Sequence, residues 1–310
     1  MTAALAVGAQ LAALLLLPIP LLGLVNRTRA LWAGRKGPRL LQTWHDLRRL
    51  LRKRPVYAAV TTLVFRAGPL VLLATTLVSG LLAPVLGAPA AVSFPYDFVL
   101  FAYLWGLGRF ALMAAALDAG SSFEGMGASR EATYAALVEP ALFLALGTLA
   151  AATGRTTFAE LLQLGWDSPA QVAIGAGVLA ALVVVLQVEA ARVPVDDPAT
   201  HLELTMIHEV MVLDHAGPEL AAVQYAAAVK LTLCAAIIAT LLNPLRAADG
   251  ALAAAAANLA LTAAVAVAVG TVESLVARLK LRAVPQLILV GGAAAGLSLL
   301  ATAWWQGGGR

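Results

Sequence analysis

The sequence predicts an all-α, polytopic integral membrane protein, built as a single domain over residues 1–310, with about eight transmembrane helices. Three observations predict this class: 61% of the residues are hydrophobic, 12% are charged, and the mean hydropathy is +0.86. Soluble domains carry about 25% charged residues, so this chain could not cover itself with a polar surface. In lipid, backbone polar groups must be satisfied within the segment, and long apolar runs are therefore expected to be helices.

Eight apolar segments are long enough to cross a bilayer, because each span needs about 20 residues. They are predicted at 3–25, 58–84, 97–118, 132–153, 170–191, 219–243, 251–272 and 285–305. The first segment lacks a basic leader and an A-x-A cleavage site, so it is expected to be a helix and not a signal peptide.

The loops differ sharply in their content of Lys and Arg. The loops 26–57, 119–131, 192–218 and 273–284 hold ten, one, one and three, whereas the loops on the opposite side and the C-terminus together hold three. Basic loops stay in the cytoplasm. The sequence therefore predicts a cytoplasmic-membrane protein whose two termini both face the outside.

The first basic loop contains a further predicted helix. Gly37-Pro38 is a favourable start and Pro55 a stop, because proline suits the first helical position and disrupts the interior of a helix. One apolar stripe recurs between them at Leu40, Trp44, Leu47 and Leu51. Basic residues fill much of the remaining surface, a pattern typical of a helix lying in the membrane interface. The alternative is a basic loop that only fixes the topology.

The loop 192–218, together with the end of the preceding span, is rich in carboxylates and histidines. Asp197-Pro198 is a good N-cap followed by proline, and it predicts a short helix over 198–213. This helix would be apolar nearly all round, so it is expected to be buried in protein. Buried carboxylates and imidazoles are costly unless they pair, hydrogen-bond or hold protons.

Ionisable residues within the spans extend this pattern. A charge at mid-bilayer costs at least about 2.5–3.5 kcal/mol, so such residues usually line a polar path or pair with one another. The candidates for a proton relay are Glu139, Glu189, Asp196, Glu203, Glu209, Asp214, His201, His208 and Lys230. The alternative is structural: Glu139, Glu189 and Glu273 would pair with Arg109, Arg192 and Lys230 to fix helix packing.

No catalytic centre is recognisable in the sequence. An intramembrane metalloprotease needs H-E-x-x-H, but His208-Glu209 lacks the second histidine. His201 and His208, two turns apart, form a weak pair of metal ligands, and no metal site is predicted. The lone Cys234 excludes an iron–sulfur cluster held by this chain alone, because such clusters need about four cysteines.

Three stretches in order carry a family resemblance. They are ALWAGRKGPRLLQTWHDLRRL at 30–50, LDAGSSFEGMGASRE at 117–131 with Glu139-Pro140 after it, and DDPATHLELTMIHEVMVLDHAG at 196–217. Together they resemble the NADH dehydrogenase subunit 1 family of complex I. The match is closest to its hydrogenase branch, typified by formate hydrogenlyase subunit 4 and the hydrogenase-4 membrane component.

The resemblance implies a bacterial or archaeal membrane subunit without an active site of its own. It would anchor a soluble arm, made of hydrogenase large and small subunits and a ferredoxin-like subunit, to antiporter-like membrane subunits that move protons or sodium. Nickel–iron and iron–sulfur centres would belong to those partners, this chain would bind no cofactor, and nucleic acid is not an expected partner. The predicted contacts with the soluble arm are Arg35, Lys36, Arg39, Arg48, Arg49 and Arg52.

The resemblance also assigns individual residues. Glu139 matches the glutamate of complex I's S-Y-E motif. The segment with Glu189, Arg192, Pro194 and Asp196 matches E-x-x-R-x-P-x-D, Glu203 matches the next glutamate, and Asp214 matches the one before Y-S-G, with about three extra residues before it.

Departures from the complex I pattern bear on quinone. Lys280 and Arg282 keep a basic pair, but Val284 replaces the acid that follows it, and Gln224 and Lys230 stand where complex I has a glutamate. They argue against a quinone site, although a quinone-site subunit of a complex I-like dehydrogenase stays as the alternative. A free-standing transporter would show repeated halves with broken helices, which this sequence lacks.

Overall fold

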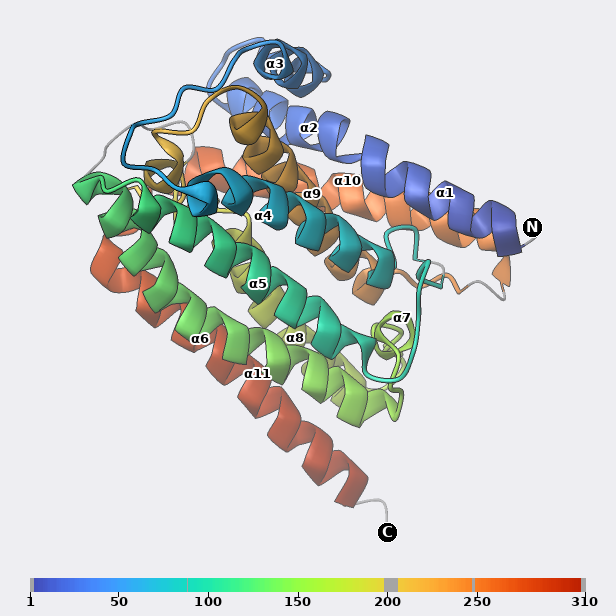
Figure 1. Cartoon of the computed structure of the whole chain (residues 1–310). Coiled ribbons are helices and arrows are strands. Elements are labelled where there is room, and N and C mark those ends of the chain that lie inside the picture. The colour runs from blue at the N-terminus through green and yellow to red at the C-terminus, as the bar shows by residue number, and fades with distance from the viewer. Residues whose placement is uncertain (1–2, 88, 198–205, 247–248, 308–310) are drawn as a thin grey trace.

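The computed structural model describes residues 3–87, 89–197, 206–246 and 249–307, and every regular element in these ranges is a helix (Figure 1). The full-length spans are α4 (Leu63–Leu82), α5 (Asp97–Asp118), α6 (Ser122–Thr153), α8 (Pro169–Glu189), α9 (Gly217–Leu242), α10 (Ala251–Leu275) and α11 (Val284–Gly307), the last preceded by the short 3₁₀ helix η3 (Leu281–Ala283). The short helix α7 (Phe158–Leu161) links α6 to α8. The predicted all-α membrane fold is therefore confirmed.

The first span is broken. α1 (Ala3–Leu16) and α2 (Pro18–Trp32) meet at Leu17 with a bend of 46°. Proline lacks an amide hydrogen and clashes with the preceding turn, so Pro18 and Pro20 explain the bend. Counted with this bent pair, the described residues contain eight candidate spans, in agreement with the sequence.

Helix α9 forms the centre of the bundle. Within its most apolar window 83% of the residues are buried, against 28% in α10 and in α11, although all three are similarly hydrophobic. It contacts α2, α3, α4, α8 and α10. Small residues bring other helices close together: a side chain at Gly68 would overlap Ala115 on the neighbouring α5. Tight packing of this kind is what joins helices in lipid, where apolar surface alone gives no preference for a neighbour.

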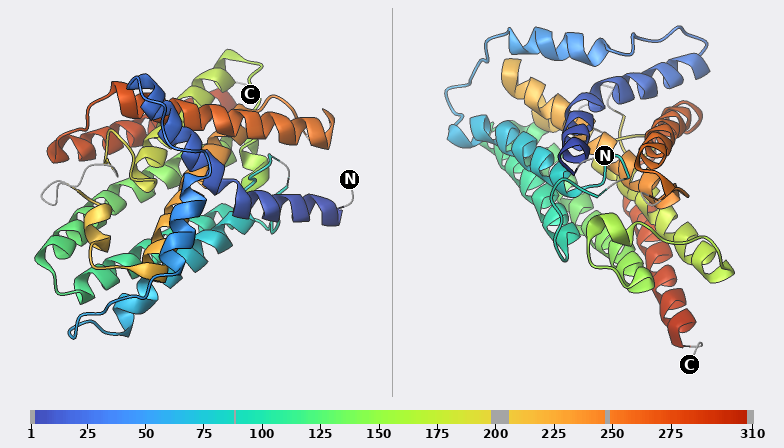
Figure 2. Two further views of the ribbon diagram at one scale, coloured as in Figure 1. Left: turned by 90° about the horizontal axis from the view of Figure 1, so that it is seen from above. Right: turned by 90° about the vertical axis from the view of Figure 1, so that its right-hand side faces the viewer.

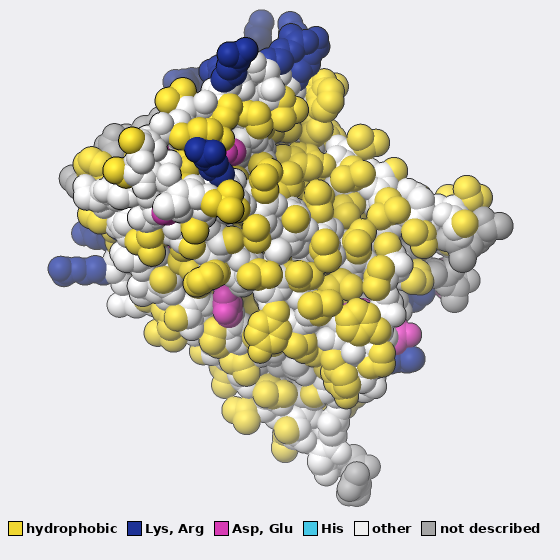
Figure 3. All heavy atoms as spheres, viewed as in Figure 1, with side chains coloured by type: hydrophobic (Ala, Val, Ile, Leu, Met, Phe, Trp, Pro, Cys, Tyr) yellow, Lys and Arg dark blue, Asp and Glu magenta, His cyan; other side chains and the backbone are white. Residues whose placement is uncertain are grey.

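Both termini lie at the same end of the bundle. Gln10 of α1 donates a hydrogen bond to the carbonyl of Ala83, in the loop after α4, and Gln306 of α11 donates one to Ala151 near the end of α6. Helix α3 and the described segments 190–197 and 206–216 lie at the other end. Figure 3 shows Lys and Arg side chains gathered there, beside an extensive apolar surface. The side of the membrane that each end faces stays a prediction.

The interfacial helix is shorter than predicted. Helix α3 runs from Gln42 to Leu51, so it does not begin at Pro38. Gly37 has a positive φ of 71°, and a side chain there would overlap Ala30 of α2, so the chain folds back on α2 before α3 begins. Figure 2 shows α3 outside the bundle of spans. Its buried Leu47 and Leu50 pack against Ala221 of α9.

Two other boundaries differ from the prediction. Helix α6 begins at Ser122, ten residues before the apolar run at 132, because the polar segment SFEGMGASRE continues the same helix beyond the apolar region. The helix predicted over 198–213 is wrong within its described part: residues 206–208 are irregular, and η1 (Glu209–Val212) is a single 3₁₀ turn. Residues 198–205 lie outside the described residues.

Candidate functional site

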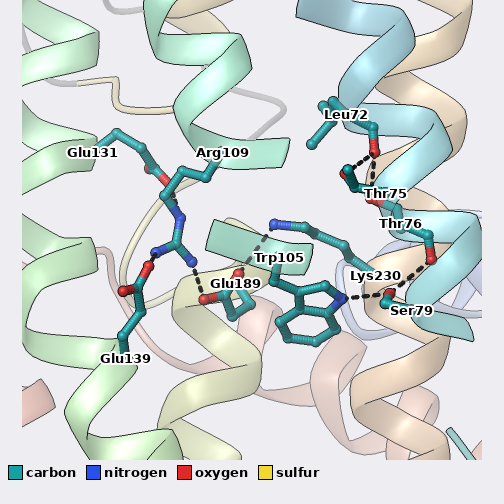
Figure 4. A network of polar contacts seen from close by, with 10 residues as sticks. All are labelled: Leu72, Thr75, Thr76, Ser79, Trp105, Arg109, Glu131, Glu139, Glu189 and Lys230. Carbon is teal, nitrogen blue, oxygen red and sulfur yellow. Dashed lines mark hydrogen bonds and ion pairs between the residues drawn. The ribbon is translucent and has the colours of Figure 1, made fainter. Parts of the chain in front are cut away.

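A buried arginine joins three carboxylates in the middle of the bundle (Figure 4). The guanidinium of Arg109, on α5, has Nε 3.1 Å from Glu131 Oε1 and Nη1 2.7 Å from Glu139 Oε1, and Nη2 contacts Glu189 Oε1. Glu131 and Glu139 lie about two turns apart on α6, so both carboxylates reach the same side. The planar guanidinium presents several donors in fixed directions, which suits it to join several carboxylates.

Lys230 extends this arrangement into the central helix. Its Nζ lies 3.1 Å from Glu189 Oε2 and 5.3 Å from the centre of the Trp105 ring. The Trp105 indole donates to Ser79 Oγ on α4 at 2.9 Å. We call the five charged groups, Arg109, Glu131, Glu139, Glu189 and Lys230, the Arg109 network. It joins α5, α6, α8 and α9, and mutual pairing reduces the high cost of charges in a membrane span.

The carboxylates of this network differ in exposure. The Glu189 side chain is 2% exposed, whereas that of Glu139 is 42% exposed. Glu139 therefore reaches the outer surface of α6 while still contacting Arg109. The network thus connects the interior of the bundle with a face of the membrane domain.

A second group of ion pairs lies nearer the end of the bundle that carries α3. Glu273 on α10 lies 3.2 Å from Arg192 and 3.9 Å from Arg29. Arg29 pairs with Asp197 at 3.1 Å, and Arg278 pairs with Asp196 at 2.9 Å. We call these six residues the Glu273 cluster.

Asp196 also holds the chain on either side of the undescribed residues. Its Oδ2 accepts the backbone amides of Ile207 and His208 at 3.1 and 3.0 Å. The carboxylate thereby fixes the segment after α8 to the segment before η1. This is a structural function that an aspartate performs well, because it accepts several hydrogen bonds at once.

An open cavity of about 480 Å³ lies between α2, α3, α9 and the segments around 190–196 and 208–212. The polar residues of its lining come from all of these elements: Asn26, Arg29, Thr43, Asp46, Arg192, Asp196, His208, Glu209 and Gln224. A smaller cavity beside it is lined by Arg109, Glu131, Glu189 and Lys230. Ala190, Ala191, His208 and Ala227 line both cavities, so the Arg109 network lies next to the larger cavity.

The structure brings some predicted relay residues together and separates others. Glu139, Glu189 and Lys230 belong to one network, while Asp196, His208 and Glu209 line the larger cavity. Asp214 is exposed and lies outside the Arg109 network. His201 and Glu203 lie outside the described residues. Whether any of these residues carries protons stays a prediction.

The sequence left open that the carboxylates of the spans form structural ion pairs, and the structure contains such pairs with partly different partners. Arg109 does pair with Glu139, but Lys230 pairs with Glu189, and Glu273 pairs with Arg192 and Arg29. Sequence reasoning missed Glu131, whose spacing of eight residues from Glu139 would have indicated it if α6 had been extended to Ser122. It also missed Arg29 and Arg278, because a basic loop gives no sign of which arginines turn inward.

A third polar group surrounds the start of α9. His215 stacks on Phe65 with ring centres 4.0 Å apart, and its Nδ1 lies 3.7 Å from Glu219, which accepts a hydrogen bond from Tyr57 at 2.6 Å. Burial lowers the pKa of His215, and the neighbouring Glu219 opposes that shift. On the opposite side of Asp214, the buried Glu124 accepts the Asp214 amide at 2.9 Å. The part of the chain that the structure describes contains no group of three or more His, Cys, Asp or Glu residues that could hold a metal ion.

The helices, ion pairs and cavity define a multi-span membrane protein with a charged interior, and comparisons with known proteins identify its family. Residues 5–303 match the NADH dehydrogenase family. Hydrogenase-4 component C of Escherichia coli K12 is 30% identical over 239 residues, which cover 76% of this chain and 74% of that protein. Formate hydrogenlyase subunit 4 of the same organism is 33% identical over 151 residues, covering 48% of this chain and 49% of that protein.

The fold agrees with this assignment. A chain of the membrane-bound sulfane sulfur reductase, an archaeal respiratory membrane complex, superposes with a TM-score of 0.77 over 95% of this chain and 98% of its own length, at 18% identity. The chain therefore belongs to the NADH dehydrogenase family, the complex I subunit 1 family. It is a membrane subunit of the hydrogenase-type or complex I-like class.

Proposed function

We propose that this chain is the membrane anchor and coupling subunit of a [NiFe]-hydrogenase-like complex of the formate hydrogenlyase or hydrogenase-4 type. In that role it links a soluble electron-transfer arm to antiporter-like subunits that translocate protons or sodium. The two named E. coli relatives support the hydrogenase branch. The observation that carries the proposal is the Arg109 network, which reaches from the smaller cavity, beside the larger one near α3, to the surface of α6 at Glu139.

The exposure of Glu139 indicates a membrane partner at this face. Tyr103, Leu107 and Phe110 are exposed apolar residues on the adjacent helix α5, and the carboxylate of Glu139 lies against Gly106. A charge facing lipid within a span costs at least about 2.5–3.5 kcal/mol. A neighbouring membrane subunit with a polar or cationic group removes that cost, and acidic side chains do break the apolar surface in Figure 3. Such a contact would couple electron transfer in the soluble arm to ion translocation in the neighbouring membrane subunits.

The opposite end of the chain offers a surface for the soluble arm. Arg35, Lys36, Arg39 and Arg49 are exposed on the segment that contains α3, and they project from the end of the bundle. Electrostatic contacts of this kind guide docking and are screened by salt. The arm would thus lie above the larger cavity. It would be close to the polar residues that connect this cavity with the Arg109 network.

The test compares Glu139→Gln with Glu160→Gln in the assembled complex. Glutamine keeps the shape and hydrogen bonding of Glu139 but removes its charge. We expect the complex to assemble with near-normal electron transfer, while ions translocated per turnover fall about tenfold or more, an effect of about 1.4 kcal/mol on the coupled step. Glu160 lies on α7 outside the network, so its variant should translocate normally.

Two results would contradict the proposal. Unchanged translocation in Glu139→Gln would remove this carboxylate from the coupling path. Loss of assembly in Glu139→Gln, with normal assembly in Glu160→Gln, would make Glu139 a structural residue.

A second candidate function is the quinone-site subunit of a complex I-like dehydrogenase. The larger cavity favours it, because its volume and its mixture of apolar and polar lining residues suit a molecule of that class. Inhibition of the complex by a quinone analogue would support this candidate over the hydrogenase role, and insensitivity would support the first.

A further inference from the structure

Helix α3 is apolar over a wide arc of its surface, and only part of that arc contacts the bundle. Leu47 and Leu50 are each 7% exposed and pack against Ala221, with Leu220 and Tyr225 beside them. Leu41, Trp44 and Leu51 are 54%, 51% and 61% exposed. Few buried contacts therefore hold α3 in place, and large apolar side chains next to that attachment are left uncovered.

The exposed apolar residues lie beside arginines. A helix turns about 100° per residue, so Trp44, Arg48 and Leu51 fall within an arc of about 60°, with Arg52 close to it. Arg49 lies on a different side and pairs with Asp46 at 3.4 Å. The segment 35–54 carries eight Lys and Arg residues against one acidic residue, Asp46.

The helices before and after α3 in the sequence place it at the level where the spans end. α2 ends at Trp32 and α4 begins at Leu63, and these two residues are 56% and 77% exposed. Trp32 at the end of α2 and Trp44 on α3 are of the residue type that is enriched at the boundary between acyl chains and headgroups. At this level we expect an exposed Trp–Leu surface next to arginines to face lipid, with the charges at the depth of the phosphates.

We propose that α3 binds an anionic phospholipid, with Trp44 and Leu51 against its acyl chains and Arg48 and Arg52 on its headgroup. Clusters of basic residues on an amphipathic helix favour anionic over zwitterionic lipids. Thr43 and Asp46 of α3 line the larger cavity. The bound lipid therefore holds α3 against α9 and keeps that wall of the cavity in place. This inference does not depend on the proposed coupling role.

The first test measures lipid retention on the purified full-length chain by native mass spectrometry, with phosphatidylglycerol or phosphatidylcholine added to the detergent. Each basic residue near an anionic surface contributes roughly fivefold in binding. We expect the wild type to retain phosphatidylglycerol, and Arg48→Gln/Arg52→Gln to bind it about 25-fold more weakly. The control Arg49→Gln/Arg155→Gln removes two charges as well, and it should bind like the wild type because neither arginine lies on the Trp44 side.

A second measurement reports where the lipid lies. In vesicles with brominated phosphatidylglycerol, tryptophan fluorescence of the wild type minus that of Trp44→Phe gives the quenching of Trp44. We expect strong quenching, and much weaker quenching in Arg48→Gln/Arg52→Gln.

Three outcomes would overturn the proposal. They are equal retention of both lipids by the wild type, equal loss in the test and control variants, and unquenched Trp44. If Arg48→Gln/Arg52→Gln keeps its lipid but releases the soluble arm from membranes, this face of α3 binds protein and not lipid.

Discussion

The Arg109 network and the Glu273 cluster both bury ion pairs, but their formal charges differ. The Arg109 network holds two cations and three carboxylates, whereas the six described residues of the Glu273 cluster hold three of each. An excess carboxylate in a low-dielectric setting favours a cationic partner on a neighbouring subunit. In the Glu273 cluster the charges balance, so no further cation is required to compensate a carboxylate. The comparison separates a network with an unbalanced negative charge from a cluster whose charges cancel.

Loss of Arg109 gives the largest expected effect. Arg109→Gln leaves Glu131, Glu139 and Glu189 with Lys230 as the remaining cation of the network. Removing one partner of a buried ion pair typically costs about 3–5 kcal/mol, so we expect poor accumulation and a strongly lowered melting temperature in detergent. Arg155→Gln, at an exposed arginine, is the matched control. Normal stability of Arg109→Gln would show that these carboxylates do not need the arginine.

An intermediate effect is expected at Glu273. Glu273→Gln gives the balanced cluster an excess positive charge, but Arg29 keeps Asp197 as a partner. We expect a loss of about 1–3 kcal/mol in stability, the cost of leaving a buried group unsatisfied. Thermal unfolding measures this loss. In the complex that remains, ions translocated per turnover should be unchanged, and a selective loss of translocation would place Glu273 in the coupling path.

The smallest effect is expected at Glu131. In Glu131→Gln, Arg109 and Lys230 still face Glu139 and Glu189, so the network becomes balanced. We expect stability within about 1 kcal/mol of wild type, because an excess carboxylate is removed and glutamine still accepts a hydrogen bond. A loss as large as that of Arg109→Gln would contradict the view that this network carries an excess of negative charge.

The candidate site was predicted in part. Ionisable residues inside apolar runs pointed to Arg109, Glu139, Glu189 and Lys230, because lipid makes each of them conspicuous in the sequence. The partners were harder to predict. Glu131 lies in a polar stretch for which hydropathy predicts a loop, although α6 continues through it. Arg29 and Arg278 lie in predicted basic loops, where the sequence does not distinguish a paired arginine from an exposed one.

The sequence by itself determined the class of protein, the positions of most spans and the family. These depend on local properties: apolar runs long enough for lipid, prolines that bend or end helices, and three motifs in order. The tertiary structure decided that α9 is central while the equally apolar α10 and α11 are peripheral. It also decided that Lys230 pairs with Glu189 and that α3 leaves Trp44 exposed. The physical reason is that hydropathy records a preference for lipid or protein over water, whereas the choice between lipid and a neighbouring helix depends on close packing and on where buried charges find partners.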